Sequence, residues 1–173
     1  LCCMIVFMDK MLILPIVGIY GLAIGSFINA WVWRVYSGRK ISSGRSMCPH
    51  CGHMLRWFEL IPVISYLSLR GRCRKCHKVI SLQYPIVEIL TALIWVMLAA
   101  AIAPVNLYGC LTLGVWLIIS SLLIAACIYD ARWMLLPDTF TVPVMIVAAV
   151  WLLVRWAGFH EGNIAITPLI GGG

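Results

Sequence analysis

Long apolar runs separated by short polar segments dominate the 173-residue chain, and their lengths predict helices that cross a membrane. Met11 to Trp33 is 23 residues long without a charge, and a helix needs roughly 20 apolar residues to span the hydrocarbon core. The uncharged stretch between Glu88 and Asp130 is interrupted at residues 104–106, where Pro-Val-Asn is typical of a turn. It therefore predicts two antiparallel spans, over residues 86–103 and 107–129.

A fourth span is predicted over residues 139–154, although this run holds only 16 uncharged residues. It crosses a membrane if Arg155 extends its long side chain to the interface. Residues 164–173 resemble the opening of a fifth span that stops before it has crossed, so we expect a truncated chain. The predicted fold is an all-α polytopic membrane protein with about four transmembrane helices and the start of a fifth. We divide it into an N-terminal segment with the first helix, a basic loop and a partial membrane core: residues 1–35, 36–85 and 86–173.

The composition agrees with a membrane protein. Hydrophobic residues make up 63% of the chain and charged residues only 11%, with a mean hydropathy of +1.01. An ordinary soluble domain carries about 25% charged residues, so this class is excluded.

Positive charge is concentrated in one loop, and this predicts how the chain is oriented across the membrane. Arg34 to Glu88 contains 10 of the 13 Lys and Arg residues and two carboxylates. Loops rich in Lys and Arg stay in the cytoplasm, so we expect residues 36–84 on that side. With spans of alternating direction, residues 130–138 return to the same face.

The basic loop contains two Cys-x-x-C motifs separated by the 21 residues 52–72. Each motif turns tightly enough to present both sulfurs to one point, so the spacing predicts a tetrahedral Zn²⁺ site. The alternatives are two disulfides or unbound thiols, and a reducing cytoplasm argues against disulfides. Three neighbouring histidines are interpreted as exposed or as supporting residues, because four cysteines already complete the site. The predicted ligands are Cys48, Cys51, Cys73 and Cys76, and the histidines are His50, His53 and His77.

The charge of this loop has three interpretations. Arg72, Arg74, Lys75 and Lys78 flank the cysteines and can offset the negative charge of a zinc tetrathiolate. A basic loop at a bilayer also lies naturally on anionic lipid. Nucleic-acid binding is disfavoured, because the basic residues are tethered at the membrane and lack an interleaved aromatic pattern.

Three carboxylates are candidates for chemistry. Asp130 ends a long apolar helix at the membrane boundary, where carboxylates are functional by default. Asp138 begins the fourth span and fits an N-cap equally well. Glu88 begins the second span, where interaction with the helix dipole suffices to explain it. Asn29 lies at depth in the first span and needs a hydrogen-bond partner on another helix.

Taken together in order, these segments resemble the type IV prepilin leader peptidases, which are bifunctional membrane enzymes. The matching segments run through nearly the whole chain and cover the first span, the cysteine loop, the entry to the second span and the Asp130 segment. They are Gly25-Ser26-Phe27-Ile28-Asn29 with Arg34, Cys48-Pro49-His50-Cys51-Gly52, Ile61-Pro62 with Ser65-Tyr66-Leu67, Gly71-Arg72-Cys73 with Cys76, Tyr84-Pro85-Ile86-Val87-Glu88, and Asp130 through Leu135-Leu136-Pro137-Asp138.

The resemblance implies that Asp130 is one of two catalytic aspartates. It assigns no catalysis to Asp138, and we keep Asp138 and Glu88 only as accessory candidates. The family's second aspartate lies in a Gly-x-Gly-Asp motif, which does not occur in the 173 residues. Two smaller departures are Leu60, where Asn is usual before Ile-Pro, and Arg132, at an often acidic position.

The resemblance further implies cleavage of the basic leader of a prepilin or pseudopilin, followed by S-adenosylmethionine-dependent methylation of the new amino terminus. Two alternatives stay open. One is a non-catalytic zinc-bearing membrane protein of a pilus or secretion system, and the other is a membrane-tethered zinc ribbon that binds nucleic acid.

Overall fold

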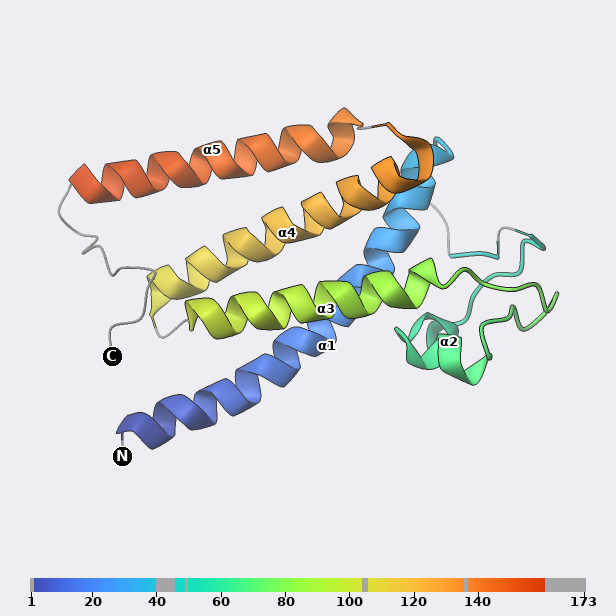
Figure 1. Cartoon of the computed structure of the whole chain (residues 1–173), viewed down its shortest axis with the longest axis horizontal. Helices are drawn as coiled ribbons and strands as arrows, with labels where there is room; N and C mark the ends of the chain where they lie inside the picture. The colour runs from blue at the N-terminus through green and yellow to red at the C-terminus, as the bar shows by residue number, and fades with distance from the viewer. Residues whose placement is uncertain (1, 40–45, 49, 104–105, 136, 161–173) are drawn as a thin grey trace.

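The protein is described by a computed structural model that covers residues 2–39, 46–48, 50–103, 106–135 and 137–160 (Figure 1). Its elements, in chain order, are α1 (Cys2–Tyr36), the 3₁₀ helix η1 (Trp57–Leu60), α2 (Ile64–Ser68), α3 (Gln83–Ile102), α4 (Leu107–Trp133) and α5 (Asp138–His160). Within these ranges the only β-structure is a pair of isolated antiparallel bridges.

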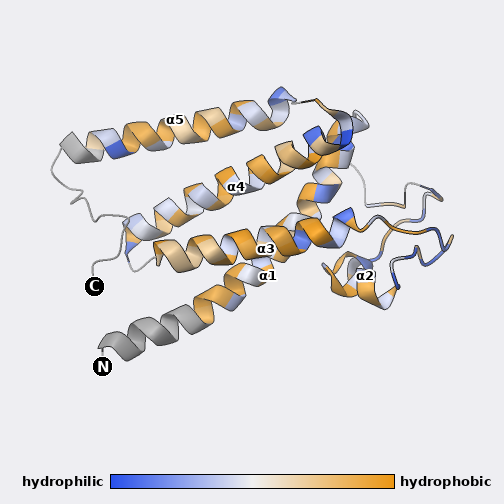
Figure 2. Cartoon of the chain, in the orientation of Figure 1, coloured by the Kyte–Doolittle hydropathy of each residue, from blue (hydrophilic) through white to orange (hydrophobic). Residues whose placement is uncertain are grey.

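Among the residues that the structure describes, four helices have the length and apolarity to cross a membrane, which confirms the all-α polytopic prediction. The candidate spans are Leu12–Tyr36, Gln83–Ile102, Leu107–Trp133 and Asp138–Ala157. Figure 2 shows hydrophobic residues along these helices, and hydrophilic residues in the loop around α2 and at the adjoining helix ends. The predicted opening of a fifth span, 164–173, lies outside the described residues.

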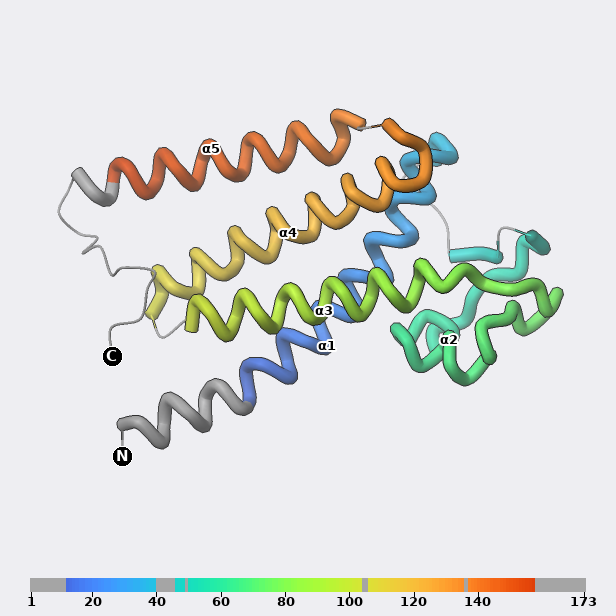
Figure 3. The backbone as a smooth tube through the Cα atoms, viewed as in Figure 1, coloured from blue at the N-terminus to red at the C-terminus, as the bar shows by residue number. Residues whose placement is uncertain are grey.

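The backbone brings the end of α1, the start of α3 and the connection from α4 to α5 to the same side of the bundle (Figure 3). The loop with η1 and α2 lies on this side as well (Figure 1). This arrangement agrees with the expectation that the cysteine loop and the Asp130–Asp138 connection share a face.

Local sequence explains where the helices end. At the opposite side of the bundle, Ala103 adopts a left-handed conformation with φ of 44° and ends α3. Asn106 then starts α4, because its side-chain oxygen accepts a hydrogen bond from the N–H of Gly109 at 2.7 Å. Asp138 is the first residue of α5, and the carbonyl of Pro137 accepts the first backbone hydrogen bonds of that helix.

Two glycines allow α1 and α3 to pack closely. A Cβ atom on Gly21 would lie 2.7 Å from the Cα of Ala92, and one on Gly25 would lie 2.7 Å from the Cα of Glu88. Small residues let membrane helices approach until their backbones touch. Asn29 adds a polar link, because its Nδ2 donates to the carbonyl of Tyr84 at 3.2 Å. The partner expected for Asn29 is therefore on α3.

Aromatic side chains join the same end of α1 to α4 and α5. Phe140 is fully buried, with its ring 4.9 Å from that of Trp31 in an edge-on arrangement and 6.0 Å from that of Tyr129. Tyr36 stacks on Trp133 with ring centroids 4.0 Å apart. These contacts fix the helix ends that carry Asp130 and Asp138 relative to α1.

Because α1 packs so closely on α3, one added methyl group at Gly25 is predicted to lower the stability of the protein. Gly25→Ala places a Cβ against the backbone of α3, and such overpacking costs about 1–3 kcal/mol. Gly114→Ala is the matched control, because nothing lies within 4 Å of its added Cβ. We expect Gly25→Ala to lower the unfolding midpoint in detergent and Gly114→Ala to leave it unchanged or raise it. Equal midpoints for the two variants would contradict this packing.

Candidate metal centre and adjoining cavity

The first cysteine motif folds as a tight knuckle. The N–H of Cys48 donates to the carbonyl of His53 at 2.9 Å, and the N–H of Gly52 donates back to Cys48 at 3.0 Å. A bridge between Met47 and Met54 closes the turn. Gly52 has a φ of 67°, a left-handed conformation that glycine adopts without steric cost.

The second motif repeats this knuckle 25 positions later. The N–H of Cys73 donates to the carbonyl of Lys78 at 2.9 Å, and the N–H of His77 donates to Cys73 at 2.9 Å. Arg72 and Val79 form the closing bridge. The turn position equivalent to Gly52 is His77, with a φ of 56°.

The two knuckles bring the four cysteine sulfurs together, all within 4.8 Å of one another. Cys48 and Cys76 are 3.9 Å apart across the cluster, and Cys51 and Cys73 are 4.0 Å apart. Four sulfurs at the Zn–S bond length of about 2.3 Å from one ion are roughly 3.8 Å apart, so the donor set fits a tetrahedral metal. The cysteines are unbridged, and they can hold a metal ion.

Their surroundings give the cysteine thiols unequal pKa values. The N–H groups of Cys76 and then Lys75 lower the pKa of Cys73 to about 7, despite its burial. The backbone N–H of His53 acts in the same direction on Cys51, but burial and the three neighbouring thiols raise the pKa of Cys51 to about 11. Because a metal requires thiolates, loading the site releases protons, and its affinity falls as the pH is lowered.

The histidines beside the cysteines are not part of the sulfur cluster. His50 and His77 are exposed. His53 lies with its Nε2 3.6 Å from Oε2 of Glu59, an ion pair when the histidine is protonated. The same carboxylate oxygen accepts the N–H of Arg56 at 2.7 Å, so Glu59 links the first knuckle to η1.

Glu88 anchors the loop to the membrane helices. It lies within α3, is 6% exposed, and accepts the N–H of Val63 at 2.7 Å and a hydrogen bond from the side chain of Ser26. Val63 has a φ of 59°, which is rare for a β-branched residue and is held by this contact. The helix dipole is therefore not the main partner of Glu88. The sequence could not indicate Val63, which is 25 residues away.

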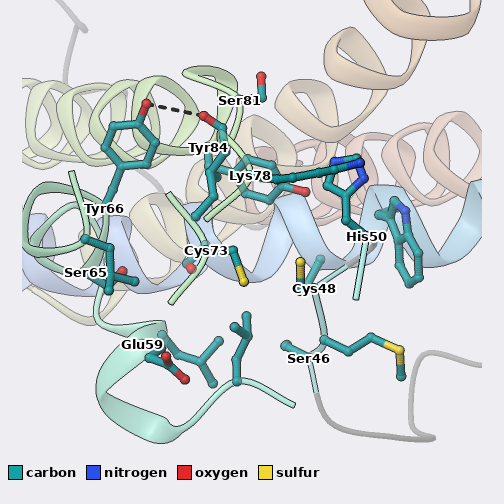
Figure 4. Close-up of a pocket in the computed structure, with 18 of the residues that line it drawn as sticks. Ser46, Cys48, His50, Glu59, Ser65, Tyr66, Cys73, Lys78, Ser81 and Tyr84 are labelled. Carbon is teal, nitrogen blue, oxygen red and sulfur yellow. Dashed lines mark hydrogen bonds between the residues drawn. The ribbon is translucent and has the colours of Figure 1, made fainter. Parts of the chain in front are cut away.

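A cavity of about 340 Å³ lies between the knuckles and the adjoining ends of the helices. In Figure 4 the sulfurs of Cys48 and Cys73, both from its lining, lie close together, with Tyr66 and Tyr84 on one side and Glu59 on the other. Glu88 and Arg132 also line it. Sequence reasoning missed this cavity and its aromatic lining, because loop folding alone brings Tyr66 to Tyr84.

Asp130, the predicted catalytic residue, lies outside the lining of this cavity. Asp130 is exposed near the end of α4 and is not among the residues that line the cavity, whereas Glu88 is. Asp138 is exposed at the start of α5, at the same end of the bundle. Chain folding thus puts the three carboxylates on one side of the bundle, but Glu88 is engaged with the loop and the two aspartates face outward.

Comparison with known proteins agrees with this architecture. Residues 19–102 match the family described as "Bacterial Peptidase A24 N-terminal domain". The Dichelobacter nodosus "Prepilin leader peptidase/N-methyltransferase" is 36% identical over 171 residues, which cover 83% of this chain and 56% of the relative. The protein of the same name from Myxococcus xanthus is 38% identical over 135 residues, covering 74% and 37%. The chain is thus similar, over most of its own length, to prepilin leader peptidases.

A third relative matches in the same way. The "Type 4 prepilin-like proteins leader peptide-processing enzyme" of Escherichia coli is 37% identical, covering 79% of this chain and 55% of the relative. The chain thus spans about a third to just over half of these relatives' lengths. No solved structure matches it. This similarity and the four apolar helices of the described residues together indicate a multi-pass membrane protein.

Because the knuckle is repeated, substitutions at its two equivalent turn positions, Gly52 and His77, are predicted to change the metal affinity in opposite directions. Gly52→Ala forces a Cβ into a left-handed conformation, which costs about 1–2 kcal/mol and should weaken metal binding by roughly tenfold. His77→Gly removes a side chain that already bears this cost, so its affinity should be unchanged or higher. Competition with a chelator measures both. Weaker binding by His77→Gly than by Gly52→Ala would contradict the assigned turns.

Proposed function

We propose that this protein acts in prepilin processing, as a prepilin leader peptidase with N-methyltransferase activity. The observation that carries the proposal is a four-cysteine cluster folded onto the ends of membrane helices, in a chain whose relatives bear that name. The proposed substrates are type IV prepilins or pseudopilins, cleaved after the basic leader and methylated on the new amino terminus with S-adenosylmethionine as methyl donor.

The proposed location is the cytoplasmic membrane of a bacterium, with the cysteine loop and the Asp130–Asp138 connection in the cytoplasm. The Lys and Arg excess between the first two spans supports this orientation. A basic substrate leader stays in the cytoplasm by the same rule. We retain the division into residues 1–35, 36–85 and 86–173, with the middle segment as the metal-binding unit and lipid around the helices.

The proposed metal is a structural zinc on Cys48, Cys51, Cys73 and Cys76. Four thiolates in a tetrahedral cluster are typical of closed structural zinc sites, which leave no position for a substrate. The ion holds the two knuckles together, and the loop in turn is attached to α3 through Glu88 and Val63. Its role is therefore to order the loop over the helix ends.

Asp130 is the proposed catalytic carboxylate. An aspartic peptidase uses one ionised carboxylate to activate water and a second, protonated one to polarise the scissile carbonyl. Exposure of Asp130 at the membrane boundary allows a peptide to reach it. Cleavage requires a second carboxylate, which the family motif Gly-x-Gly-Asp would supply.

Glu88 and Asp138 are weaker candidates for that second carboxylate. Glu88 is buried and already accepts hydrogen bonds from Val63 and Ser26. Asp138 stabilises the first turn of α5 through the helix dipole. We therefore assign both to structural roles.

A second candidate function is that of a non-catalytic zinc-bearing membrane protein of a pilus or secretion system. The outward-facing position of Asp130, away from the cavity, favours it. Nucleic acid is not a proposed partner, because the basic loop packs against the membrane helices.

Zinc content tests the metal centre. Cys73→Ser removes one of four ligands and should lower zinc from about one ion per chain to a small fraction, with loss of order in the loop while the helices persist. Cys110→Ser is the control, because Cys110 is an exposed cysteine on α4 outside the cluster. Mass spectrometry of the purified proteins measures the metal, and unchanged zinc in Cys73→Ser would rule out the four-cysteine site.

Prepilin cleavage in detergent tests the catalytic assignment, using a chain that continues through a Gly-x-Gly-Asp segment. Asp130→Asn should abolish cleavage, because an amide can neither accept the proton from water nor share one with a second carboxylate. Asp138→Asn should keep most activity and cost about 1 kcal/mol or less in stability. The 173-residue form should not cleave. Cleavage by that form would make Asp138 or Glu88 the second carboxylate and overturn the assignment.

A further inference from the structure

The short helices η1 and α2 expose large apolar side chains on the outside of the cysteine loop. Trp57 is 76% exposed, Ile64 63% and Leu67 68%. Ile64 and Leu67 are three positions apart and therefore share one face of α2. The other face, which includes Ser65 and Tyr66, lines the cavity. A surface helix in water has the reverse pattern, with its apolar face against the protein.

The sequence around α2 has the length and the flanking charges of a segment that lies in a membrane interface. Residues 57–69 contain a single charge, Glu59, and are bounded by Arg56 and Arg70. An apolar run of about 10–14 residues is too short to span a bilayer but is typical of re-entrant or interfacial segments. The carboxylate points inward, since Glu59 is buried and accepts the N–H of Arg56. Exposure of the apolar side chains excludes the other common explanation, a buried core helix.

The contact between Val63 and Glu88 gives the depth of this segment. Gln83 is the first residue of α3 and of the candidate span Gln83–Ile102. Glu88 comes five residues later, roughly 7.5 Å further along the helix axis at 1.5 Å per residue. The N–H of Val63 donates to Oε2 of Glu88 at 2.7 Å, so the residue before α2 lies alongside the first turns of the span (Figure 1). α2 is therefore held at the level where the apolar span begins.

Hydrogen bonds within the protein suit this segment to apolar surroundings. Backbone outside regular helices is tolerated at membrane depth only where the protein itself supplies partners for its polar groups. Pro62 has no N–H, and Glu88 binds the N–H of Val63. The hydroxyl of Ser68 donates to the carbonyl of Ser65 at 3.0 Å, so this polar side chain on the outer side of α2 has its partner within the helix.

We infer that residues 57–69 form a re-entrant anchor, which inserts Trp57, Ile64 and Leu67 into the lipid leaflet beside α3 on the loop side of the bundle. The partner is the glycerol and acyl-chain region of a phospholipid, whatever its headgroup. Trp57 and the flanking arginines suit the interface, where aromatic rings and long basic side chains reach from apolar to polar surroundings. This contact differs from attraction between a basic loop and anionic headgroups, because apolar burial is not screened by salt.

The anchor is joined to the metal-binding part of the loop. The hydroxyl of Tyr66, on α2, donates to the carbonyl of Ile80, just after the second knuckle, at 3.3 Å. The guanidinium carbon of Arg74, in that knuckle, lies 5.4 Å from the ring centroid of Phe58 on η1. Insertion of the anchor therefore also keeps the four cysteines close to the membrane surface.

Photocross-linking in lipid nanodiscs tests the inference on the 173-residue protein with its zinc bound. p-Benzoylphenylalanine in place of Ile64 or of Leu67 should form covalent adducts with phospholipid acyl chains, which mass spectrometry detects. The control replaces Lys75, an exposed residue of the second knuckle. We expect about fivefold fewer lipid adducts there, because an interfacial segment buries only its apolar face in the acyl region. Zinc content checks that each variant keeps its loop.

A charge in the anchor gives a second, independent measurement. With the photoreactive residue at position 64, Leu67→Glu should lower the adduct yield about fivefold or more, because a carboxylate is costly in hydrocarbon. Leu67→Met is the matched control and should leave the yield unchanged. Adducts of the unsubstituted anchor should persist in uncharged phosphatidylcholine and at about 1 M salt, where surface electrostatics are screened.

Each outcome supports or overturns the anchor. Lipid adducts at position 64 or 67 above the level at position 75 support it, and adducts at neither position overturn it. Cross-links between two copies of the chain in place of lipid adducts would make this face a dimer interface and overturn it. Loss of the adducts in salt would reduce the contact to headgroup attraction, with the same result. None of these measurements depends on prepilin cleavage, so the proposed function is tested separately.

Discussion

The close contact of α1 with α3 determines where everything else lies. Gly21 and Gly25 allow the two backbones to touch. At the same interface Asn29 donates to the carbonyl of Tyr84, and the side chain of Ser26 donates to Glu88. The interface fixes the end of α1 and the start of α3, which are the two points from which the cysteine loop leaves and returns. The loop therefore folds back over the helix ends, and its anchor at Val63 is made by a residue of the interface itself.

Apolar run length was sufficient to predict the helices. The predicted span 107–129 lies within α4, and the predicted span 86–103 lies within α3 except for Ala103, which caps that helix. Charge is costly in a bilayer, so its absence marks the spans. The helix ends were less accurate. α1 continues to Tyr36 and α4 to Trp133, past the charged residues Arg34 and Asp130 before which the predicted spans ended, and the rings of Tyr36 and Trp133 stack there.

The part of the site that depends only on the spacing of residues in the sequence, the cysteine cluster, could be predicted. Two Cys-x-x-C motifs indicated a four-sulfur cluster, and the sulfurs lie within 4.8 Å of one another. The partner of Glu88 and the cavity were not predictable, because each depends on how a long loop returns to the helices. A carboxylate near a helix start has a ready local explanation, and only the three-dimensional arrangement shows that Glu88 binds Val63 instead.

The paired knuckles also have an entropic consequence. Neither knuckle alone can complete a tetrahedral site, so a bound ion ties together two points of one long connection whose ends are already held by α1 and α3. Closing a loop costs less entropy when its ends are fixed. Helix association in the membrane therefore makes metal binding more favourable, and the bound ion makes helix association more favourable in return. Weakening the Gly21 or Gly25 contact between α1 and α3 would therefore lower the affinity of the cysteine loop for its metal.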